Sequence, residues 1–334
     1  MARSKRHWVS QQVGSFHVIS RTTGGDILFH DEEKEYFLKL LERFASGFFV
    51  AIHAFCIMGN HFHVLATGLE LEAKKAPVED LYRRYRLLYP NIPEPPEGYY
   101  ESDGSLVPDA DGGVERLRQR LGSISRFVQE LKQSFSRWYN KKHNRKGYLW
   151  SERFKGVIVD KGEGQLVCSA YIDLNPVRAN MVKRPEEYRW SSLGMQVRSP
   201  GRAGKLLSLI SSTNGSNGDE ERASESQSEY AHFLSRKPKE KLSWYREFIY
   251  ISGGIEREGK GAISREIENE VIRCHGKLGI GDSFRYRVKN ISEGLAIGTY
   301  SFISLLQEKY QRKFIRPRAF LAGNILFATR VLRV

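Results

Sequence analysis

Two apolar segments joined by a Gly-Asn pair constrain the fold of this chain more than any other feature. Residues 48–58 form an almost continuous apolar run, Gly59-Asn60 is a common two-residue hairpin turn, and residues 61–67 return as a partner strand. Neighbouring side chains on a strand point to opposite faces, so His61 and His63 share one face while Phe62 points to the other. The sequence therefore predicts a hairpin whose two imidazoles can close on one divalent metal ion.

The apolar pattern of the first 195 residues predicts an α+β fold. Strands are expected where apolar residues alternate or run together, and helices where they recur three or four apart. The first elements follow the order β-α-β-β, and a helix, a strand and a second helix come after them. The expected strands cover residues 13–20, 48–58, 61–67 and 154–159, and the expected helices begin near residues 31, 114 and 163.

Changes in composition divide the chain into three parts. Residues 1–195 hold the α+β pattern, with an insertion at about 70–113 whose residues 87–113 are rich in Pro and Gly and suggest a loop. Residues 196–229 are expected to be a flexible linker, because their second half contains almost nothing that can enter a core. Residues 230–334 contain enough apolar side chains for a smaller helical C-terminal domain. It is either a DNA-binding module or a cap on the core.

The charge balance predicts a polyanionic partner. The chain has 53 Lys and Arg against 39 Asp and Glu, a formal net charge of +14. Its three cysteines are widely spaced and odd in number, which argues against a disulfide framework and for a reducing compartment. No apolar stretch is long enough for a membrane span, and the N-terminus lacks an apolar signal core. We therefore expect a cytoplasmic, nucleoid-associated protein of bacterial type.

Tyr171 and Asn175 are the candidate partners of the imidazole pair. They are four residues apart on an expected helix, so they lie on one face and can aim a phenol and an amide oxygen at the same target. Two nitrogens and one oxygen suit a divalent ion that keeps open positions for substrate oxygens. The alternative is structural: Tyr171 packs its ring, and Asn175 caps the helix before Pro176.

Residues 131–155 combine cations with aromatic rings and predict contact with nucleic acid. Cations neutralise phosphates and flat rings stack on unpaired bases, although a solvated helix face over core aromatics would look similar. The expected contacts are Lys132, Arg137, Lys141, Lys142, Arg145, Lys146, Trp150, Arg153 and Lys155. His17 and His53 lie in expected strands, where a hydrogen-bonded core histidine is the favoured interpretation.

Four stretches together resemble the REP-associated branch of the single-tyrosine HUH transposases, with coverage of about residues 8–195. Each motif is modest alone, but four in the right order are specific. They are Phe16-His17-Val18-Ile19-Ser20-Arg21, Met58-Gly59-Asn60-His61-Phe62-His63-Val64, residues 138–150, and Tyr171-Ile172-Asp173-Leu174-Asn175-Pro176-Val177-Arg178-Ala179.

The resemblance implies a ferredoxin-like sandwich with a central antiparallel sheet, the HUH fold. It implies His61 and His63 as ligands of Mg²⁺ or Mn²⁺, Asn175 as third ligand and Tyr171 as the nucleophile that forms a 5′-phosphotyrosine. The implied substrate is single-stranded DNA at hairpin-forming repeats, the repetitive extragenic palindromes, which is cleaved and rejoined. Arg21, from the first stretch, joins the expected DNA contacts. Relatives occur as monomers or homodimers.

Other functions fit parts of the pattern. A hairpin-binding protein that does not cut DNA would keep the basic aromatic segment and would need no metal site. A relaxase or replication-initiator-like nickase would use similar chemistry, commonly with a second tyrosine, and none stands four residues from Tyr171. RNA binding would also suit the charge.

Overall fold

Four antiparallel strands form the sheet that carries the imidazole pair. The computed structural model describes residues 14–91, 98–100, 106–108, 113–211, 233–236, 238–254, 258–264, 296–309, 315–318 and 325–330. Within them, the central strands are β1 (Gly14–Arg21), β2 (Val50–Ile57), β3 (His61–Gly68) and β6 (Lys155–Asp160), in the order β2-β3-β1-β6. All three neighbouring pairs are antiparallel. The predicted hairpin and the predicted α+β class are therefore confirmed.

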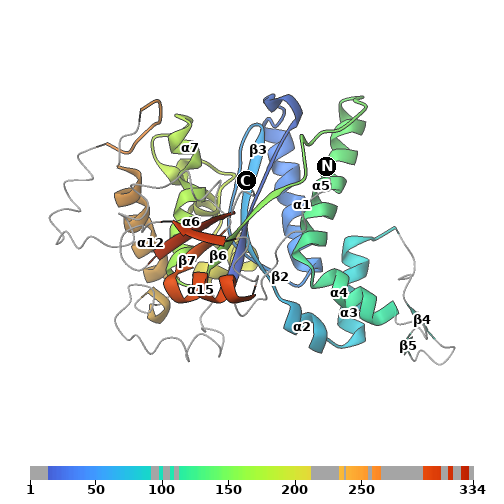
Figure 1. Cartoon of the computed structure of the whole chain (residues 1–334). Helices are drawn as coiled ribbons and strands as arrows, with labels where there is room; N and C mark the ends of the chain where they lie inside the picture. Colours follow the sequence, from blue (N-terminus) through green and yellow to red (C-terminus); the bar gives the residue numbers. More distant parts are fainter. Residues whose placement is uncertain are drawn as a thin grey trace.

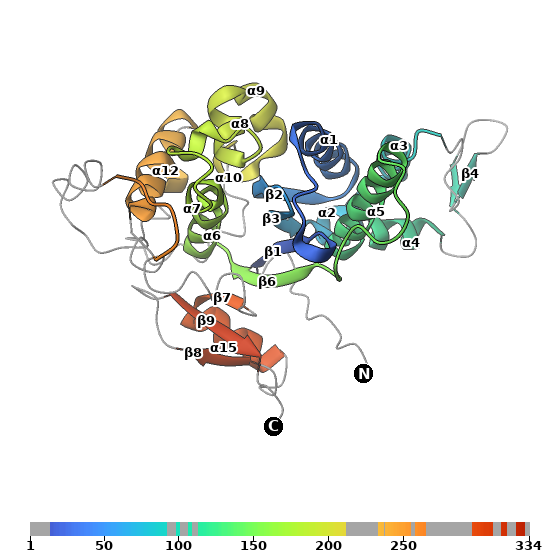
Figure 2. The same ribbon diagram turned by 90° about the horizontal axis from the view of Figure 1, so that it is seen from above.

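Helices cover both faces of this sheet. Helices α1 (Asp31–Gly47) and α5 (Ile124–Lys142) pack on one face, and α6 (Glu163–Asp173) packs on the other against β2, β3 and β6 (Figures 1 and 2). The sheet therefore separates the two groups of helices. Along the chain the central elements follow the order β1-α1-β2-β3-α5-β6, with α6 directly after β6.

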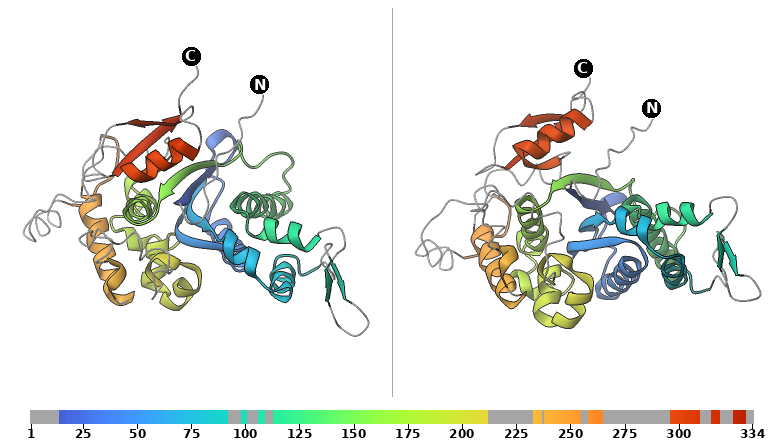
Figure 3. Two further views of the ribbon diagram at one scale, coloured as in Figure 1. Left: turned by 60° about the horizontal axis from the view of Figure 1, so that its bottom comes forward. Right: turned by 90° about the horizontal axis from the view of Figure 1, so that it is seen from below.

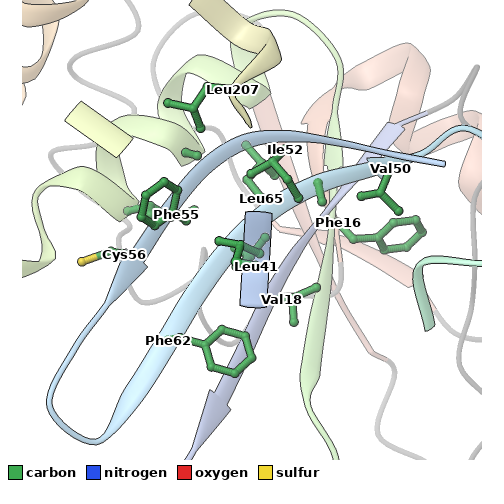
Figure 4. Close-up of a cluster of buried hydrophobic side chains, with 14 of the residues drawn as sticks. Phe16, Val18, Leu41, Val50, Ile52, Phe55, Cys56, Phe62, Leu65 and Leu207 are labelled. Atoms are coloured by element: carbon green, nitrogen blue, oxygen red, sulfur yellow. The ribbon is translucent and has the colours of Figure 1, made fainter. Parts of the chain in front are cut away.

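Alternation along the strands explains why α1 and α5 pack where they do. Phe16 and Val18 of β1 and Phe62 of β3 lie in a buried apolar cluster that includes Leu41 of α1 (Figure 4). The Phe62 ring lies 4.8 Å from Phe37 and 5.5 Å from Trp150, measured between ring centroids. Burial of a side chain of this size contributes on the order of 2–3 kcal/mol. The apolar face of the hairpin thus holds the two helices, and the opposite face is left for α6.

The insertion at about 70–113 is more ordered than the sequence suggests. Helices α2 (Glu70–Lys75) and α3 (Val78–Leu88) fill its first half, and a small ladder of β4 (Gly98–Tyr100) and β5 (Leu106–Pro108) follows. The interpretation of residues 87–113 as a loop is wrong for these two short strands. The helix expected to begin near residue 114 is divided into α4 (Gly113–Leu121) and α5, because Gly122 breaks it and the Ser123 hydroxyl accepts from the Arg126 N–H.

The expectation of a flexible linker at 196–229 is wrong for its first part. Residues 192–211 form three short helices, α8 (Ser192–Arg198), α9 (Pro200–Leu206) and α10 (Ser208–Ser211). Leu206 and Leu207 are buried, and Leu207 forms a bridge with Ile52 of β2. Apolar side chains in this segment pack against the sheet, and this packing orders the first part of the expected linker. Residues 212–229 lie outside the described residues.

The C-terminal region contains strands as well as helices, which corrects the expectation of a helical region. Helix α12 (Pro238–Gly253) packs against α6 and α10, whereas β7 (Ala296–Thr299), β9 (Ile325–Arg330) and β8 (Ile315–Arg318) extend the central sheet beyond β6 (Figure 3). β7 is parallel to β6, and α15 (Tyr300–Lys309) follows it. The Asp160 carboxylate accepts hydrogen bonds from the Thr299 N–H and hydroxyl. The division into separate domains remains a prediction.

The remaining short elements are η1 (Thr23–Gly25), α7 (Asn175–Arg178) and η2 (Pro185–Glu187). None of the helices among the residues described is both long and apolar enough to cross a bilayer.

A carboxylate on α6 connects that helix to two others. Asp173 is fully buried; its Oδ1 accepts from the Ser192 hydroxyl at 2.7 Å and the Leu193 N–H at 2.9 Å, and its Oδ2 accepts from the Tyr245 hydroxyl at 2.9 Å. Burial raises the pKa of this carboxyl to about 6. These three donors fix the end of α6, two residues after Tyr171.

We expect Asp173→Ala to lower the free energy of unfolding by about 2–4 kcal/mol, because it removes the acceptor that three buried donors share, although the Ser192 hydroxyl can turn to the Phe55 carbonyl. Tyr245→Phe removes one of the three hydrogen bonds and should cost about 1 kcal/mol. Urea unfolding followed by circular dichroism measures both. Equal losses in the two variants would contradict a role for Asp173 as the common acceptor.

His53 anchors β2 to α10 and α6 through a second polar network. Its Nδ1 is 2.8 Å from the Ser208 hydroxyl, and its Nε2 is 2.7 Å from the Thr67 hydroxyl and 3.3 Å from the Gln165 amide. The sequence-based interpretation of His53 as a hydrogen-bonded core histidine agrees with this geometry. Burial lowers the pKa of His53 to about 4.

This shift predicts a loss of stability in mild acid. The unfolded chain binds a proton at His53 near pH 6.5, whereas the folded chain resists it until about pH 4, so the stabilisation present above pH 6.5 is lost as the pH falls towards 4. The slope from this group is at most about 1.4 kcal/mol per pH unit. We expect His53→Gln to flatten the pH dependence of the unfolding free energy in this window. An unchanged slope would exclude His53 as a source.

Candidate metal and nucleophile site

The pairing register between β1 and β3 determines which face of the sheet carries His61 and His63. His61 is opposite Arg21 and His63 is opposite Ile19, and opposite residues on paired strands share a face. Phe62 is opposite Ser20 and belongs to the other face, which α1 and α5 cover. The imidazoles therefore lie on the α6 side of the sheet, as the alternation predicts.

Helix α6 brings Tyr171 to this face. The centroid of the Tyr171 ring lies 5.9 Å from that of His63 and 5.7 Å from that of His17, and the His61 and His63 rings are 5.0 Å apart. The guanidinium carbon of Arg178 lies 5.1 Å from the Tyr171 ring centroid. Tyr171 is largely enclosed, with 7% of its surface exposed. The Tyr171 ring therefore lies beside the rings of His17 and His63 and the guanidinium of Arg178, and His61 adjoins His63.

Hydrogen bonds hold one nitrogen of each imidazole. His61 Nδ1 lies 2.6 Å from Asn60 Oδ1, and His63 Nδ1 lies 2.9 Å from His17 Nε2. Burial, with a smaller contribution from Arg21, lowers the pKa of His61 to about 4. Burial and the neighbouring imidazoles hold the pKa of His63 well below its usual range. Both rings are therefore neutral near pH 7, the form that binds metal ions.

Asn175 stands at the junction of α6 and α7. Its Nδ2 donates to the Tyr171 carbonyl at 3.0 Å and to the Ile172 carbonyl at 3.2 Å. The alternative interpretation of Asn175 as a helix cap is therefore correct for the amide nitrogen. Both of these hydrogen bonds use Nδ2, so Oδ1 is the atom of this side chain that remains suited to a cation.

His61 and His63 are the two side chains at this site that could hold a divalent ion. In the described part of the chain, no cluster of three His, Cys, Asp or Glu side chains is arranged to hold a metal. A site at His61 and His63 therefore relies on two neutral imidazole nitrogens, and further ligands have to be amide, substrate or water oxygens. Imidazole nitrogens suit several divalent transition metals, and oxygen ligands are those that Mn²⁺ and Mg²⁺ prefer.

A groove of about 1170 Å³ lies between α5 and the loop that leads to β6. Lys132, Arg137 and Arg153 supply its positive charge, and Tyr148 and Trp150 supply its aromatic surface. Tyr148 is 89% exposed, which makes its ring available for stacking. Lys132 donates to the Glu152 carbonyl and lies 5.2 Å from the Trp150 ring centroid, so it also shapes the groove wall.

The remaining expected DNA contacts are distributed over three places. Arg21 and Lys155 lie on the imidazole face, since Arg21 pairs with His61 and Lys155 pairs with Ile19. Lys141 and Lys146 are exposed around the end of α5, and Arg145 is half-buried there. Lys142 differs from these residues, because its Nζ lies 2.8 Å from Glu33 and 2.6 Å from Glu32 on α1, and its role in DNA contact stays a prediction. Its charge is already neutralised within the protein.

Sequence reasoning gave no site role to three residues. Asn60 and His17 hold the imidazoles, and Arg178 lies beside the phenol. All three fall within the motifs quoted above, so their positions were visible although their contacts were not. His17 is indeed a buried, hydrogen-bonded strand histidine, but its partner is His63.

No protein-family model matches this sequence, and a search of curated proteins finds no match. Among solved structures, a REP-associated tyrosine transposase bound to a REP hairpin is similar to this chain, with 13% sequence identity and a TM-score of 0.37. The similarity covers 60% of this chain and 87% of that chain.

Proposed function

We propose that this protein is a metal-dependent strand transferase that cleaves and rejoins single-stranded DNA at hairpin-forming repeats. The observation that carries the proposal is the convergence of Tyr171, His61 and His63, which come from α6 and β3 and meet with centroid distances of 5.0–5.9 Å. A phenol can act as the nucleophile in phosphodiester transfer, and two neutral imidazoles beside it can hold a divalent ion that assists the attack.

The fold supports the same proposal. We assign the β-α-β-β-α-β order, with strand order β2-β3-β1-β6, to the ferredoxin-like sandwich on which HUH sites are built. A fold alone does not specify a function, so this assignment supports the proposal only together with the side chains.

His61 and His63 would hold the cation, and Asn175 Oδ1 is the proposed third protein ligand. A bound Mg²⁺ or Mn²⁺ supplies polarisation of a phosphoryl oxygen and offsets charge in the transition state. Arg178, whose guanidinium lies over the Tyr171 ring, stabilises negative charge that develops on the phenolic oxygen.

Tyr171 performs the transfer in this proposal. Its phenolic oxygen attacks the phosphorus of a phosphodiester, the bond to the 3′-oxygen breaks, and the proton lost by the phenol balances the proton gained by the departing 3′-hydroxyl. The product is a 5′-phosphotyrosine, and attack by a 3′-hydroxyl reverses the step. No water or nucleoside triphosphate is consumed, so the energy of the bond is retained.

The groove beside α5 is the proposed DNA-binding surface. Its exposed tyrosine and its cations suit a strand with unpaired bases, and Arg21 and Lys155 extend positive charge onto the imidazole face. A folded single strand that combines a stem with unpaired flanks would use both regions at once.

A hairpin-binding protein without cleavage activity is the second candidate. The enclosure of Tyr171 favours it, because a nucleophile has to reach the phosphorus and this ring is 7% exposed. The two candidates make opposite predictions for a covalent product.

We expect the full-length protein, incubated with labelled hairpin DNA and Mn²⁺, to form a protein–DNA adduct that survives denaturation. Tyr171→Phe should abolish the adduct, because it removes the attacking oxygen, while hairpin affinity stays within about threefold. His61→Ala and His63→Ala should also abolish the adduct. Gel electrophoresis under denaturing conditions measures the product.

Absence of any adduct in the wild-type protein, with hairpin binding intact, would favour the binding protein. An adduct that persists in Tyr171→Phe would assign the nucleophile to another residue.

Two cations on α5 provide a matched test of the groove. Arg137→Gln removes a groove cation, and we expect weaker hairpin binding and a salt dependence (log Kd against log salt) whose slope is smaller by about one. Lys142→Gln removes the same charge from the same helix, but its Nζ pairs with Glu32 and Glu33. It should change the affinity less than twofold. Electrophoretic mobility shifts at several salt concentrations measure both, and equal effects would exclude the groove as the main contact.

A further inference from the structure

The two imidazoles of the candidate metal site are held in the same way. Each ring has its Nδ1 within hydrogen-bond distance of a neighbouring side chain, Asn60 for His61 and His17 for His63. A neutral imidazole carries its proton on one nitrogen and offers a lone pair on the other. The neighbour of Nδ1 therefore decides which nitrogen is free for a cation.

The geometry around Asn60 fixes the tautomer of His61. The Asn60 amide nitrogen donates to the Gly25 carbonyl at 2.7 Å, which determines the orientation of the amide. Its Oδ1 then faces His61 Nδ1 at 2.6 Å and can only accept. His61 Nδ1 therefore carries the proton, and the lone pair lies on Nε2.

His17 has the equivalent position at His63. Its Nε2 is 2.9 Å from His63 Nδ1, and the two rings are stacked with centroids 5.1 Å apart. One of the two nitrogens has to donate. If His63 donates, its Nε2 has a free lone pair; if His17 donates, His63 carries its proton on Nε2 and cannot bind a cation there.

We propose that Asn60 and His17 are positioning residues that keep the proton of each imidazole on Nδ1, so that His61 and His63 both present Nε2 to a divalent cation. The inference deepens the proposed function, on which its metal-binding part rests. Outer hydrogen-bond partners of this kind orient metal-binding histidines and raise their affinity.

The placement of His17 supports a role beyond packing. It is fully buried, stacks on His63 and meets the edge of the Tyr171 ring at 5.7 Å. A phenylalanine would fill the same space and keep the ring contacts, whereas only an acceptor can keep the His63 proton on Nδ1. His17→Phe and His17→Gln therefore separate packing from hydrogen bonding.

The first test reads the tautomers directly, without metal or DNA. Long-range ¹H–¹⁵N correlation spectra of the full-length, ¹⁵N-histidine-labelled protein at pH 7.5 distinguish Nδ1–H from Nε2–H rings. We expect Nδ1–H for both His61 and His63 in the wild type. His17→Phe should move His63 to Nε2–H, Asn60→Ala should do the same for His61, and His17→Gln should retain Nδ1–H at His63. An Nε2–H pattern for either ring in the wild type would overturn the inference for that residue.

The second test measures Mn²⁺ binding to the same proteins by electron paramagnetic resonance of free Mn²⁺. We expect His17→Phe to weaken the affinity about 10–100-fold and His17→Gln to restore most of it. Unchanged thermal unfolding temperatures confirm that each variant is folded. Equal loss in both folded variants, or no loss in His17→Phe, would overturn the role of His17. A wild type that shows both Nδ1–H tautomers but binds no Mn²⁺ would instead overturn the proposed metal-dependent function and the metal-binding part of this inference.

Discussion

The antiparallel register between β1 and β3 is the constraint on which the candidate site depends. It places His63 opposite Ile19 and His61 opposite Arg21. A slip of one residue would move every side chain of the strand to the other face. Phe62 would then face α6, and both imidazoles would enter the apolar layer between the sheet and α1. Burial of two unpartnered polar rings there would cost several kcal/mol in total, so the hydrophobic pattern that builds the core also selects the face of the site.

The sequence was enough to predict the elements that depend on residues close together in the chain. The hairpin follows from an apolar run, a Gly-Asn turn and a returning strand, and the face shared by Tyr171 and Asn175 follows from helical periodicity. β7 could not be predicted in this way, because its four residues form a strand by pairing with β9 and with β6, and β6 lies more than a hundred residues earlier. Helices α8 to α10 are similar, since buried contacts with β2 order a segment whose composition suggests a linker.

In the candidate site too, the residue types could be identified from the sequence, but their contact partners could not. His61, His63 and Tyr171 were identified from their types and spacing, and the fold brings their rings together. Lys142 looked equivalent to its basic neighbours, but Glu32 and Glu33 come from a helix about a hundred residues away and neutralise it. A sequence gives the sign of a charge, whereas its availability depends on tertiary contacts. His17 is the opposite case, because an interpretation as a core residue concealed its contact with the site.

The C-terminal strands change the edge of the sheet beside the site. Without them β6 would be an edge strand, and exposed edges invite pairing with other chains. β7 covers only Ile158 and Val159 of β6, and the Asp160 carboxylate fixes the end of β7 through Thr299. The Lys155 end of β6 pairs with β1 on one side, and among the described residues no strand pairs with it on the other. The added strands therefore protect the edge at the end far from the imidazoles. Lys155, at the other end and on the imidazole face, stays exposed, with its Nζ 3.8 Å from the Glu152 carboxylate. One end of β6 is thus protected by β7, and the other end, on the side of the imidazoles, stays accessible.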